Sequence, residues 1–172
     1  MILKAFSEDY FKRLKNIRKH KIIFFNGCFD IMHVGHLAMI NKIKGYAEML
    51  WPSGNYKIIC GLNSDESVKL QDKKHPLINS EKDRALFLEH LDVDVIIFDE
   101  KDPSALLMSL VPDVVAKGLE YERKMYPERN FLIKSDIEVK YIRMEEGYST
   151  SNAYNKIKSY VLDEIKERLN ET

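Results

Sequence analysis

The chain has 172 residues, and lysine plus arginine equal aspartate plus glutamate at 27 each. This length suits one domain with a real core, and the balanced charge argues against a nucleic-acid-binding protein, which would need a basic field. No apolar run approaches the ~20 residues that span a bilayer, and two cysteines, Cys28 and Cys60, are too few for a disulfide framework. We therefore expect a soluble cytoplasmic protein that contacts neither nucleic acid nor membrane.

The first third of the chain predicts a helix, a strand and a second helix. Phe6, Ser7 and Phe11 fit an N-cap with a hydrophobic staple, so residues 1–20 should form an N-terminal helical segment. Residues 22–25 are apolar and rich in Ile, as in a strand buried on both faces. After residues 26–36, apolar residues recur at steps of three and four up to residue 50, which indicates a helix.

Strand and helix patterns then alternate to the end of the chain. Further strands are expected at residues 57–62, 93–98, 114–117 and 139–143. Ser80 begins a capping-box-like helix, Pro103 begins another, and Ser149 caps a last helix over 149–170 that should pack on the core. This order predicts a single domain over residues 1–172 with an α/β, Rossmann-like fold, a doubly wound parallel five-stranded sheet flanked by helices.

Residues 26–36, NGCFDIMHVGH, join the first strand to the helix that follows it and predict a phosphate site. A strand that turns directly into a helix presents free N–H groups and the positive end of the helix dipole. Gly27 and Gly35 allow the backbone to turn tightly and to approach an anion. His33 and His36 are three residues apart, so their side chains point the same way and can donate to phosphoryl oxygens.

Three features in or near this stretch allow more than one interpretation. Asp30 fits a helix N-terminal acid, a carboxylate that orients an imidazole, or a Mg²⁺ ligand through water. The charged run at 72–75 fits either a solvated loop or a functional loop after the second strand. Cys28, His33, His36 and Cys60 could form a zinc site, although they lack a paired C-x-x-C.

Four ordered motifs resemble those of the cytidylyltransferase-like nucleotidyltransferases. Residues 27–36 match G-x-F-D-x-x-H-x-G-H, and His33-Val-Gly-His36 is similar to the HxGH motif of that superfamily. Residues 61–65 are similar to the turn after the second strand, residues 117–121 to K-G-G-D-Y, and residues 146–151 to G-x-S-T-[TS]. The resemblance covers about residues 22–158. It is closest to the heptose 1-phosphate adenylyltransferase group and next to glycerol-3-phosphate cytidylyltransferase.

The resemblance implies that a nucleoside monophosphate is transferred from a nucleoside triphosphate (NTP), with ATP favoured, to a sugar phosphate such as heptose 1-phosphate. Pyrophosphate would be released, Mg²⁺ would enter with the NTP, and a homodimer or higher homo-oligomer is expected. The protein itself offers no confident metal ligand. The alternatives are a CTP-dependent glycerol- or polyol-phosphate cytidylyltransferase and a non-catalytic nucleotide-binding module.

The resemblance also assigns site residues. The residues expected to be catalytic are His33, His36, Lys69 and Arg84. The residues expected to bind the nucleotide are Asn26, Gly27, Cys28, Phe29, Asp30, Gly35, Lys117, Gly118, Glu120, Ser149, Thr150 and Ser151. Those expected at the acceptor phosphate are Asp65, Lys73 and Lys74. For Arg84 the alternative is a surface salt bridge. Leu119 and Glu120 replace the second glycine and the aspartate of K-G-G-D-Y, and Met144 stands where cytidylyltransferases carry arginine, which favours ATP.

Overall fold

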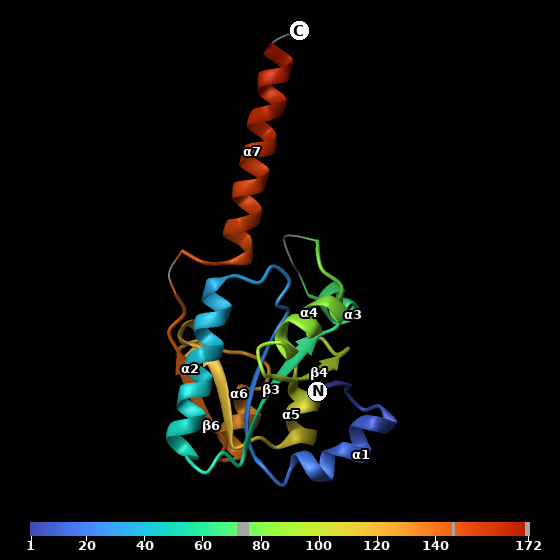
Figure 1. The fold of residues 1–172 in the computed structure, drawn as a ribbon, viewed down its shortest axis with the longest axis vertical. Helices are drawn as coiled ribbons and strands as arrows, with labels where there is room; N and C mark the ends of the chain where they lie inside the picture. Colours follow the sequence, from blue (N-terminus) through green and yellow to red (C-terminus); the bar gives the residue numbers. More distant parts are fainter. Residues whose placement is uncertain (72–75, 146, 171–172) are drawn as a thin grey trace.

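The computed structural model describes residues 1–71, 76–145 and 147–170 (Figure 1). Within these residues a six-stranded parallel sheet has the order β1-β4-β3-β2-β5-β6. Its strands are β1 (Ile2–Lys4), β2 (Lys21–Gly27), β3 (Tyr56–Asn63), β4 (Asp94–Phe98), β5 (Val114–Gly118) and β6 (Glu138–Ile142). The helices are α1 (Glu8–Ile17), α2 (Val34–Leu50), α3 (Asp65–Lys69), α4 (Glu81–Glu89), α5 (Ser104–Leu110), α6 (Arg129–Lys134) and α7 (Thr150–Asn170), with a 3₁₀ turn η1 (Leu119–Tyr121).

The predicted α/β, Rossmann-like parallel sheet is confirmed, with one strand more than the five expected. The additional strand, β1, has three residues and pairs with β4 at the edge of the sheet, where Ile2 lies opposite Val95. Three residues are too few to show a strand pattern in the sequence. The short helices α3 and α6 were not predicted for the same reason.

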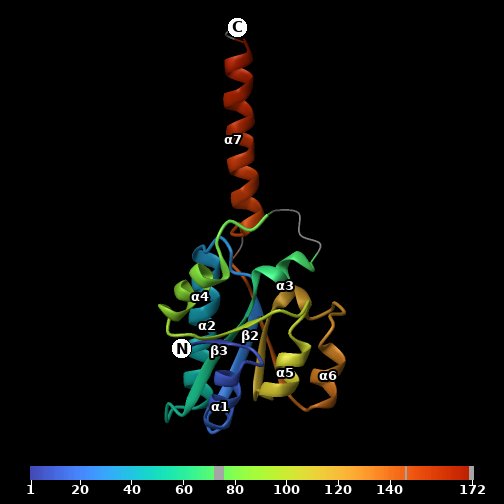
Figure 2. The ribbon, with the colours of Figure 1, turned by 90° about the vertical axis from the view of Figure 1, so that its right-hand side faces the viewer.

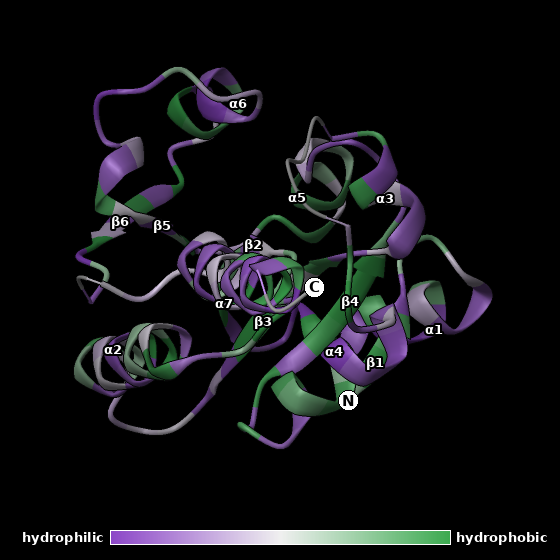
Figure 3. Ribbon diagram, turned by 90° about the horizontal axis from the view of Figure 1, so that it is seen from above, coloured by the Kyte–Doolittle hydropathy of each residue, from purple (hydrophilic) through white to green (hydrophobic). Residues whose placement is uncertain are grey.

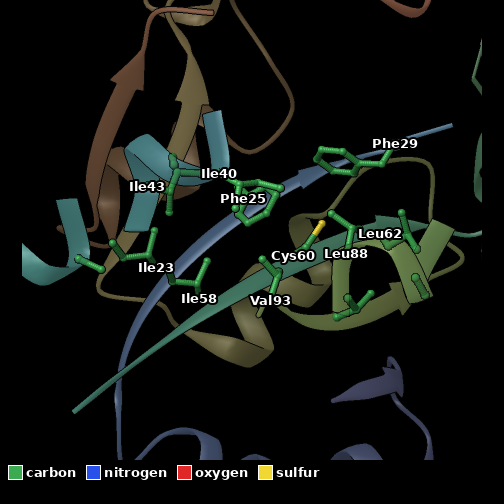
Figure 4. Packing of buried hydrophobic residues seen from close by; sticks show 14 of the residues in the cluster. Ile23, Phe25, Phe29, Ile40, Ile43, Ile58, Cys60, Leu62, Leu88 and Val93 are labelled. Carbon is green, nitrogen blue, oxygen red and sulfur yellow. The ribbon is translucent and has the colours of Figure 1, made fainter. Parts of the chain in front are cut away.

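Two apolar layers cover the two faces of the sheet. On β2, Ile23 and Phe25 face one cluster with α2 and α4, which Figure 4 shows, whereas Ile22 and Phe24 face a second cluster with α1, α5 and α6. Figure 3 shows α2 and α4 on one side of the sheet and α5 and α6 on the other. Because both faces of the central strands are buried, these strands form the continuous apolar runs that the sequence displays.

Polar side chains cap the helices as predicted. Ser7 Oγ accepts a hydrogen bond from the Tyr10 N–H at 3.1 Å, and Ser80 Oγ accepts one from the Asp83 N–H at 3.3 Å. The rings of Phe6 and Phe11 lie 6.3 Å apart across the start of α1, as a hydrophobic staple requires. These local signals were enough to place the helix starts.

The last helix differs from the prediction that it packs on the core. α7 has 21 residues, none of the described ones is buried, and Figures 1 and 2 show it extending away from the sheet. Its apolar side chains, among them Ile157, Val161 and Ile165, are 44–61% exposed. The amphipathic pattern predicted the helix correctly, but such a pattern does not specify what the apolar face contacts. No described helix is long and apolar enough to cross a membrane.

The strand order places the ligand-binding edge between β2 and β5. From β2 the chain moves through β3 and β4 to one side of the sheet, and β5 and β6 lie on the other side. The strand order therefore reverses at β2 and β5, and open parallel sheets bind ligands beyond the carboxyl ends of the strands at such a point.

Candidate active site

The turn from β2 into α2 is held by a buried aromatic side chain. Phe29 adopts φ 48°, a left-handed conformation, and its ring is 6% exposed and packs edge-on against Phe25 at 5.7 Å. A Cβ at Gly27 would lie 2.9 Å from the Phe29 ring, so the ring can occupy this position only beside a glycine. The turn thus keeps its shape by inserting Phe29 into the core below it.

His33 and His36 lie together at the start of α2, as their spacing predicted. His33 is the N-cap residue, and the two imidazole rings stack with centroids 3.8 Å apart and an interplanar angle of 22°. Nδ1 of each ring is buried and has no hydrogen-bond partner in the described part of the chain. An unpartnered buried polar atom costs about 1–3 kcal/mol, so two in one place mark a pair of side chains whose position is not explained by the stability of the fold.

Burial keeps both histidines neutral. It lowers the pKa of His36 from 6.5 to about 4, with a smaller contribution from the charge of His33, and it also lowers the pKa of His33. Near pH 7 each imidazole therefore carries one N–H, and the pair presents hydrogen-bond donors without the mutual repulsion of two cations.

The start of α7 lies beside the histidine pair. The Tyr148 ring is 6.3 Å from the His33 ring, and a Cβ added to Gly35 would lie 3.1 Å from Cβ of Tyr148. Ser149 Oγ caps α7 by accepting the N–H of Asn152 at 3.0 Å. The structure therefore brings the first and last sequence motifs together, although more than 100 residues separate them.

An ion pair fastens the last motif to α2. Lys42 Nζ donates to the Arg143 carbonyl at 3.0 Å and to the Glu145 carboxylate at 2.7 Å. This contact lies just before the Gly147-Tyr148-Ser149 segment, so it helps to hold that segment over the start of α2. Thr150 is half-buried and Ser151 is exposed in the first turn of α7.

Lys117 is held at the end of β5 by a buried carboxylate that sequence reasoning missed. Its Nζ donates to Asn26 Oδ1 at 2.9 Å and to Glu128, and it lies 5.2 Å from the centroid of the Tyr126 ring. The side chains of Lys117 and Glu128 are 9% and 3% exposed. Glu128 is the N-cap residue of the six-residue α6, a helix too short to give a sequence signal.

A cavity of about 610 Å³ opens between the carboxyl ends of β2 and β5. Of the predicted nucleotide-binding residues, it is lined by Asn26, Gly27, Cys28, Lys117 and Gly118. Its volume lies in the range of small-molecule sites. The cavity and the histidine pair occupy the same edge of the sheet, where the strand order predicts a ligand.

Arg84 is a buried structural residue in this structure. It is 0% exposed, and its guanidinium donates to the carbonyls of Cys28 at 2.6 Å, Asn63 at 2.8 Å and Asn79 at 3.2 Å, and to Asp65 Oδ1 at 2.7 Å. The alternative of a surface salt bridge is therefore wrong. Because these bonds join the ends of β2 and β3 to α3 and α4, we assign Arg84 to positioning the turn that carries the site.

Asp30 also has a structural position. The residue is 8% exposed, and its carboxylate accepts hydrogen bonds from the backbone N–H groups of Ile78 at 3.1 Å and Asn79 at 2.8 Å. The main-chain carbonyl of Asp30 accepts a further bond from the Asn79 side-chain amide at 2.6 Å. These bonds tie the β2–α2 turn to the segment before α4. Asp30 therefore acts neither as an acidic residue at a helix N-terminus nor as a carboxylate that orients an imidazole.

Of the remaining predicted residues, two are exposed and make local contacts, and two lie outside the described residues. Lys69 on α3 is exposed and pairs with Glu66 at 2.6 Å, and this contact raises its pKa. Glu120 is exposed in η1 and folds back over Gly118, since a Cβ there would meet its carboxylate. Lys73 and Lys74 lie outside the described residues.

The zinc alternative has no support in the described ranges, which contain no cluster of three or more His, Cys, Asp or Glu able to hold a metal. Cys60 is fully buried in mid-strand, and burial raises the pKa of its thiol well above the usual value. A thiol in that state is a poor metal ligand, because zinc binds the thiolate.

Comparison with known proteins agrees with this geometry. The profile of the family described as Cytidylyltransferase-like matches residues 24–162. The chain belongs to the cytidylyltransferase-like family. It is thus a nucleotidyltransferase, and the matched residues run from β2 into α7, including both the histidine pair and the serine-threonine motif.

Individual relatives match most of this chain but only part of their own length. Bifunctional protein HldE of Helicobacter pylori (strain ATCC 700392 / 26695) is 41% identical over 150 residues, or 86% of this chain, and that of Wolinella succinogenes is 44% identical over 145 residues, or 81%. The chain spans 30% and 27% of the length of these two relatives. The crystal structure of the lipopolysaccharide core biosynthesis protein from Thermoplasma volcanium GSS1 shares the fold, with a TM-score of 0.51 at 23% identity over 75% of this chain and 98% of that one.

Proposed function

We propose that this nucleotidyltransferase transfers a nucleoside monophosphate from an NTP, with ATP favoured, to a sugar phosphate such as heptose 1-phosphate. The observation that carries the proposal is the stacked histidine pair, with its two unpartnered ring nitrogens, beside the N-terminus of α7. The likeness to the heptose 1-phosphate adenylyltransferase group and the HldE relatives support the choice of substrates.

The reaction needs no enzyme nucleophile. An oxygen of the acceptor phosphate attacks the α-phosphorus of the NTP, the bond from that phosphorus to the bridging oxygen of the β-phosphate breaks, and pyrophosphate leaves with the electron pair. The attacking phosphate is already an anion, so a strong general base is not required. The protein then contributes alignment of the two substrates and stabilisation of the charge that develops on the triphosphate.

The residues divide this work between two helix starts. His33 and His36 would donate hydrogen bonds to the α- and β-phosphates from the start of α2. Ser149 uses its oxygen as an acceptor for Asn152, so its hydroxyl proton remains free to donate to the β- or γ-phosphate, with Thr150 beside it. Both helix N-termini add N–H groups and a favourable dipole. Lys69 and Asp65 on α3 are proposed to lie at the acceptor phosphate.

Magnesium is proposed to enter with the NTP. The described residues offer no carboxylate cluster for a divalent ion, and the Asp30 carboxylate already accepts backbone N–H bonds. The described residues therefore show no metal site of their own, so the triphosphate would carry the ion. The expected homo-oligomer stays a prediction.

A pyrophosphate-release assay tests the proposal, with four NTPs against the phosphates of heptose, glycerol, ribitol and choline. We expect ATP with heptose 1-phosphate to give the highest kcat/KM, and His36→Ala to lower it by about 10²–10³. His90→Ala, an exposed histidine at the C-cap of α4, is the matched control and should leave the rate unchanged. CTP with glycerol phosphate as the best pair would contradict the assignment. Thermal stabilisation by a nucleotide without product from any pair would show a binding module instead.

A further inference from the structure

The buried Lys117–Glu128 pair has hydrogen-bonding capacity that the fold does not use. Among the described residues only Lys117 donates to the Glu128 carboxylate, which can accept about four bonds. Lys117 uses two of its three N–H donors, on Asn26 and Glu128, and no acceptor in the described chain takes the side-chain amide N–H groups of Asn26. In the described chain neither the Asn26 amide nitrogen nor the second Glu128 carboxylate oxygen is a buried atom without a partner, and Asn26, Lys117 and Glu128 all border accessible space.

That space is the cavity between β2 and β5. Asn26, Lys117 and Glu128 all line it, and so does Tyr121, whose ring lies 5.8 Å from the Lys117 ammonium and 5.9 Å, edge-on, from the Tyr126 ring. The cavity wall therefore combines a free carboxylate oxygen, amide and ammonium donors, and an aromatic side chain, all within one group of contacting residues.

The charges of this wall exclude a phosphate. Lys117 and Glu128 together are neutral, and an anion bound beside them would face the carboxylate, which is 3% exposed and poorly screened. The histidine pair and the start of α7 suit phosphoryl groups better, because they offer imidazole donors and a helix N-terminus. The ligand that fits the wall is neutral and carries several hydroxyls, because each hydroxyl can donate to a carboxylate and accept from an ammonium or amide.

We propose that Glu128, with Lys117 and Asn26, forms a hydroxyl-recognition site for the sugar part of a substrate. The proposal rests on the proposed function, which brings two candidate sugars to this edge of the sheet: the ribose of the NTP and the acceptor sugar. Glu128 accepts hydrogen bonds from neighbouring hydroxyls, and Lys117 and Asn26 donate to the same hydroxyls. The site discriminates against analogues that lack them, because the buried carboxylate would then lose its water without a replacement partner.

Isothermal titration calorimetry with pairs of substrates and deoxy analogues tests this site. One arm compares ATP with 2′,3′-dideoxy-ATP, and the other compares a sugar 1-phosphate with a deoxy analogue in the presence of α,β-methylene-ATP. In the wild-type chain one arm should show a deoxy penalty of about 10- to 100-fold in Kd, which is the value of one hydrogen bond to a charged group. The arm that shows it identifies which sugar occupies the cavity.

The variant Glu128→Gln separates recognition from structural support. We expect the deoxy penalty to fall toward one in the affected arm alone, whereas Glu122→Gln, an exposed residue between η1 and α6, should retain it. If Glu128→Gln does not fold, Asn26→Ala keeps the ion pair and should show a smaller loss in the same arm. An unchanged penalty in these variants, equal weakening of both arms, or no penalty in the wild-type chain would overturn the proposal. Because binding needs no turnover, absence of transfer in the pyrophosphate assay would leave this result interpretable.

Discussion

Replacing Arg84 by methionine should destabilise the protein far more than a surface substitution does. Methionine keeps much of the side-chain volume but removes the guanidinium, so three main-chain carbonyls, of Cys28, Asn63 and Asn79, lose their buried donor. At about 1.5 kcal/mol for each unpaired carbonyl, the free energy of unfolding should fall by about 4.5 kcal/mol. For a chain of this size that corresponds to a decrease in Tm of about 9–18 °C.

Urea denaturation followed by circular dichroism measures this change. Arg13→Met is the matched control, since the Arg13 side chain is 55% exposed and, within the described ranges, pairs only with Asp9 one helical turn away. It should change the unfolding free energy by less than about 0.5 kcal/mol. A loss below 1 kcal/mol for Arg84→Met, together with a more than tenfold weaker NTP affinity, would refute the positioning role and indicate that the guanidinium contacts the ligand.

Three further changes test the histidine pair and the helix starts around it. Gly35→Ala places a Cβ 3.0 Å from His33 Nδ1 and should lower kcat/KM in the pyrophosphate assay by at least about tenfold. In the same helix the Cβ of Gly45→Ala meets nothing within 4 Å, so this control should slightly raise the free energy of unfolding measured in urea. Without ligand the pKa of His36 is about 4, and the negative charge of a bound triphosphate should raise it. At a pH between the pKa of the ligand-free protein and that of the complex, binding therefore takes up protons and becomes stronger as the pH falls. Calorimetry at pH 6 in two buffers should detect this uptake, and equal uptake by His36→Asn would contradict it. Ser149→Ala should reduce kcat about tenfold or more with little change in Tm, because its helix buries no residue; an unchanged kcat would remove Ser149 from the mechanism.

The sequence was sufficient for features that depend on residues close together in the chain. The β2–α2 turn, the stacked pair of His33 and His36, and the cap of Ser149 on α7 all involve contacts within a few residues. Backbone hydrogen-bonding needs and helix periodicity dictate such features locally. For this reason the residues of the proposed phosphate-binding part of the site could be placed before the fold was known.

Features that depend on distant residues could not be predicted in the same way. Arg84 contacts the Cys28 carbonyl 56 positions earlier, and its helix gave the same pattern as one with an exposed arginine. Glu128 acquires its role only because α6 places it beside β5, and neither its neighbours nor its spacing distinguish it from a surface glutamate. The exposed face of α7 is the reverse case, in which an amphipathic pattern predicts a buried face but does not identify its partner.

The two parts of the site therefore differ in how the chain encodes them. Phosphates are recognised by helix starts and short side chains, which a single continuous motif can supply. A sugar must be recognised by donors and acceptors on several sides. In the proposed hydroxyl-recognition site these come from β2, β5 and the start of α6, which meet where the strand order reverses. The departures at Leu119 and Glu120 lie in the exposed η1 turn, whereas Glu128 is buried in the cavity wall. Substrate choice should therefore respond more strongly to changes at Glu128 than to restoring glycine and aspartate at positions 119 and 120.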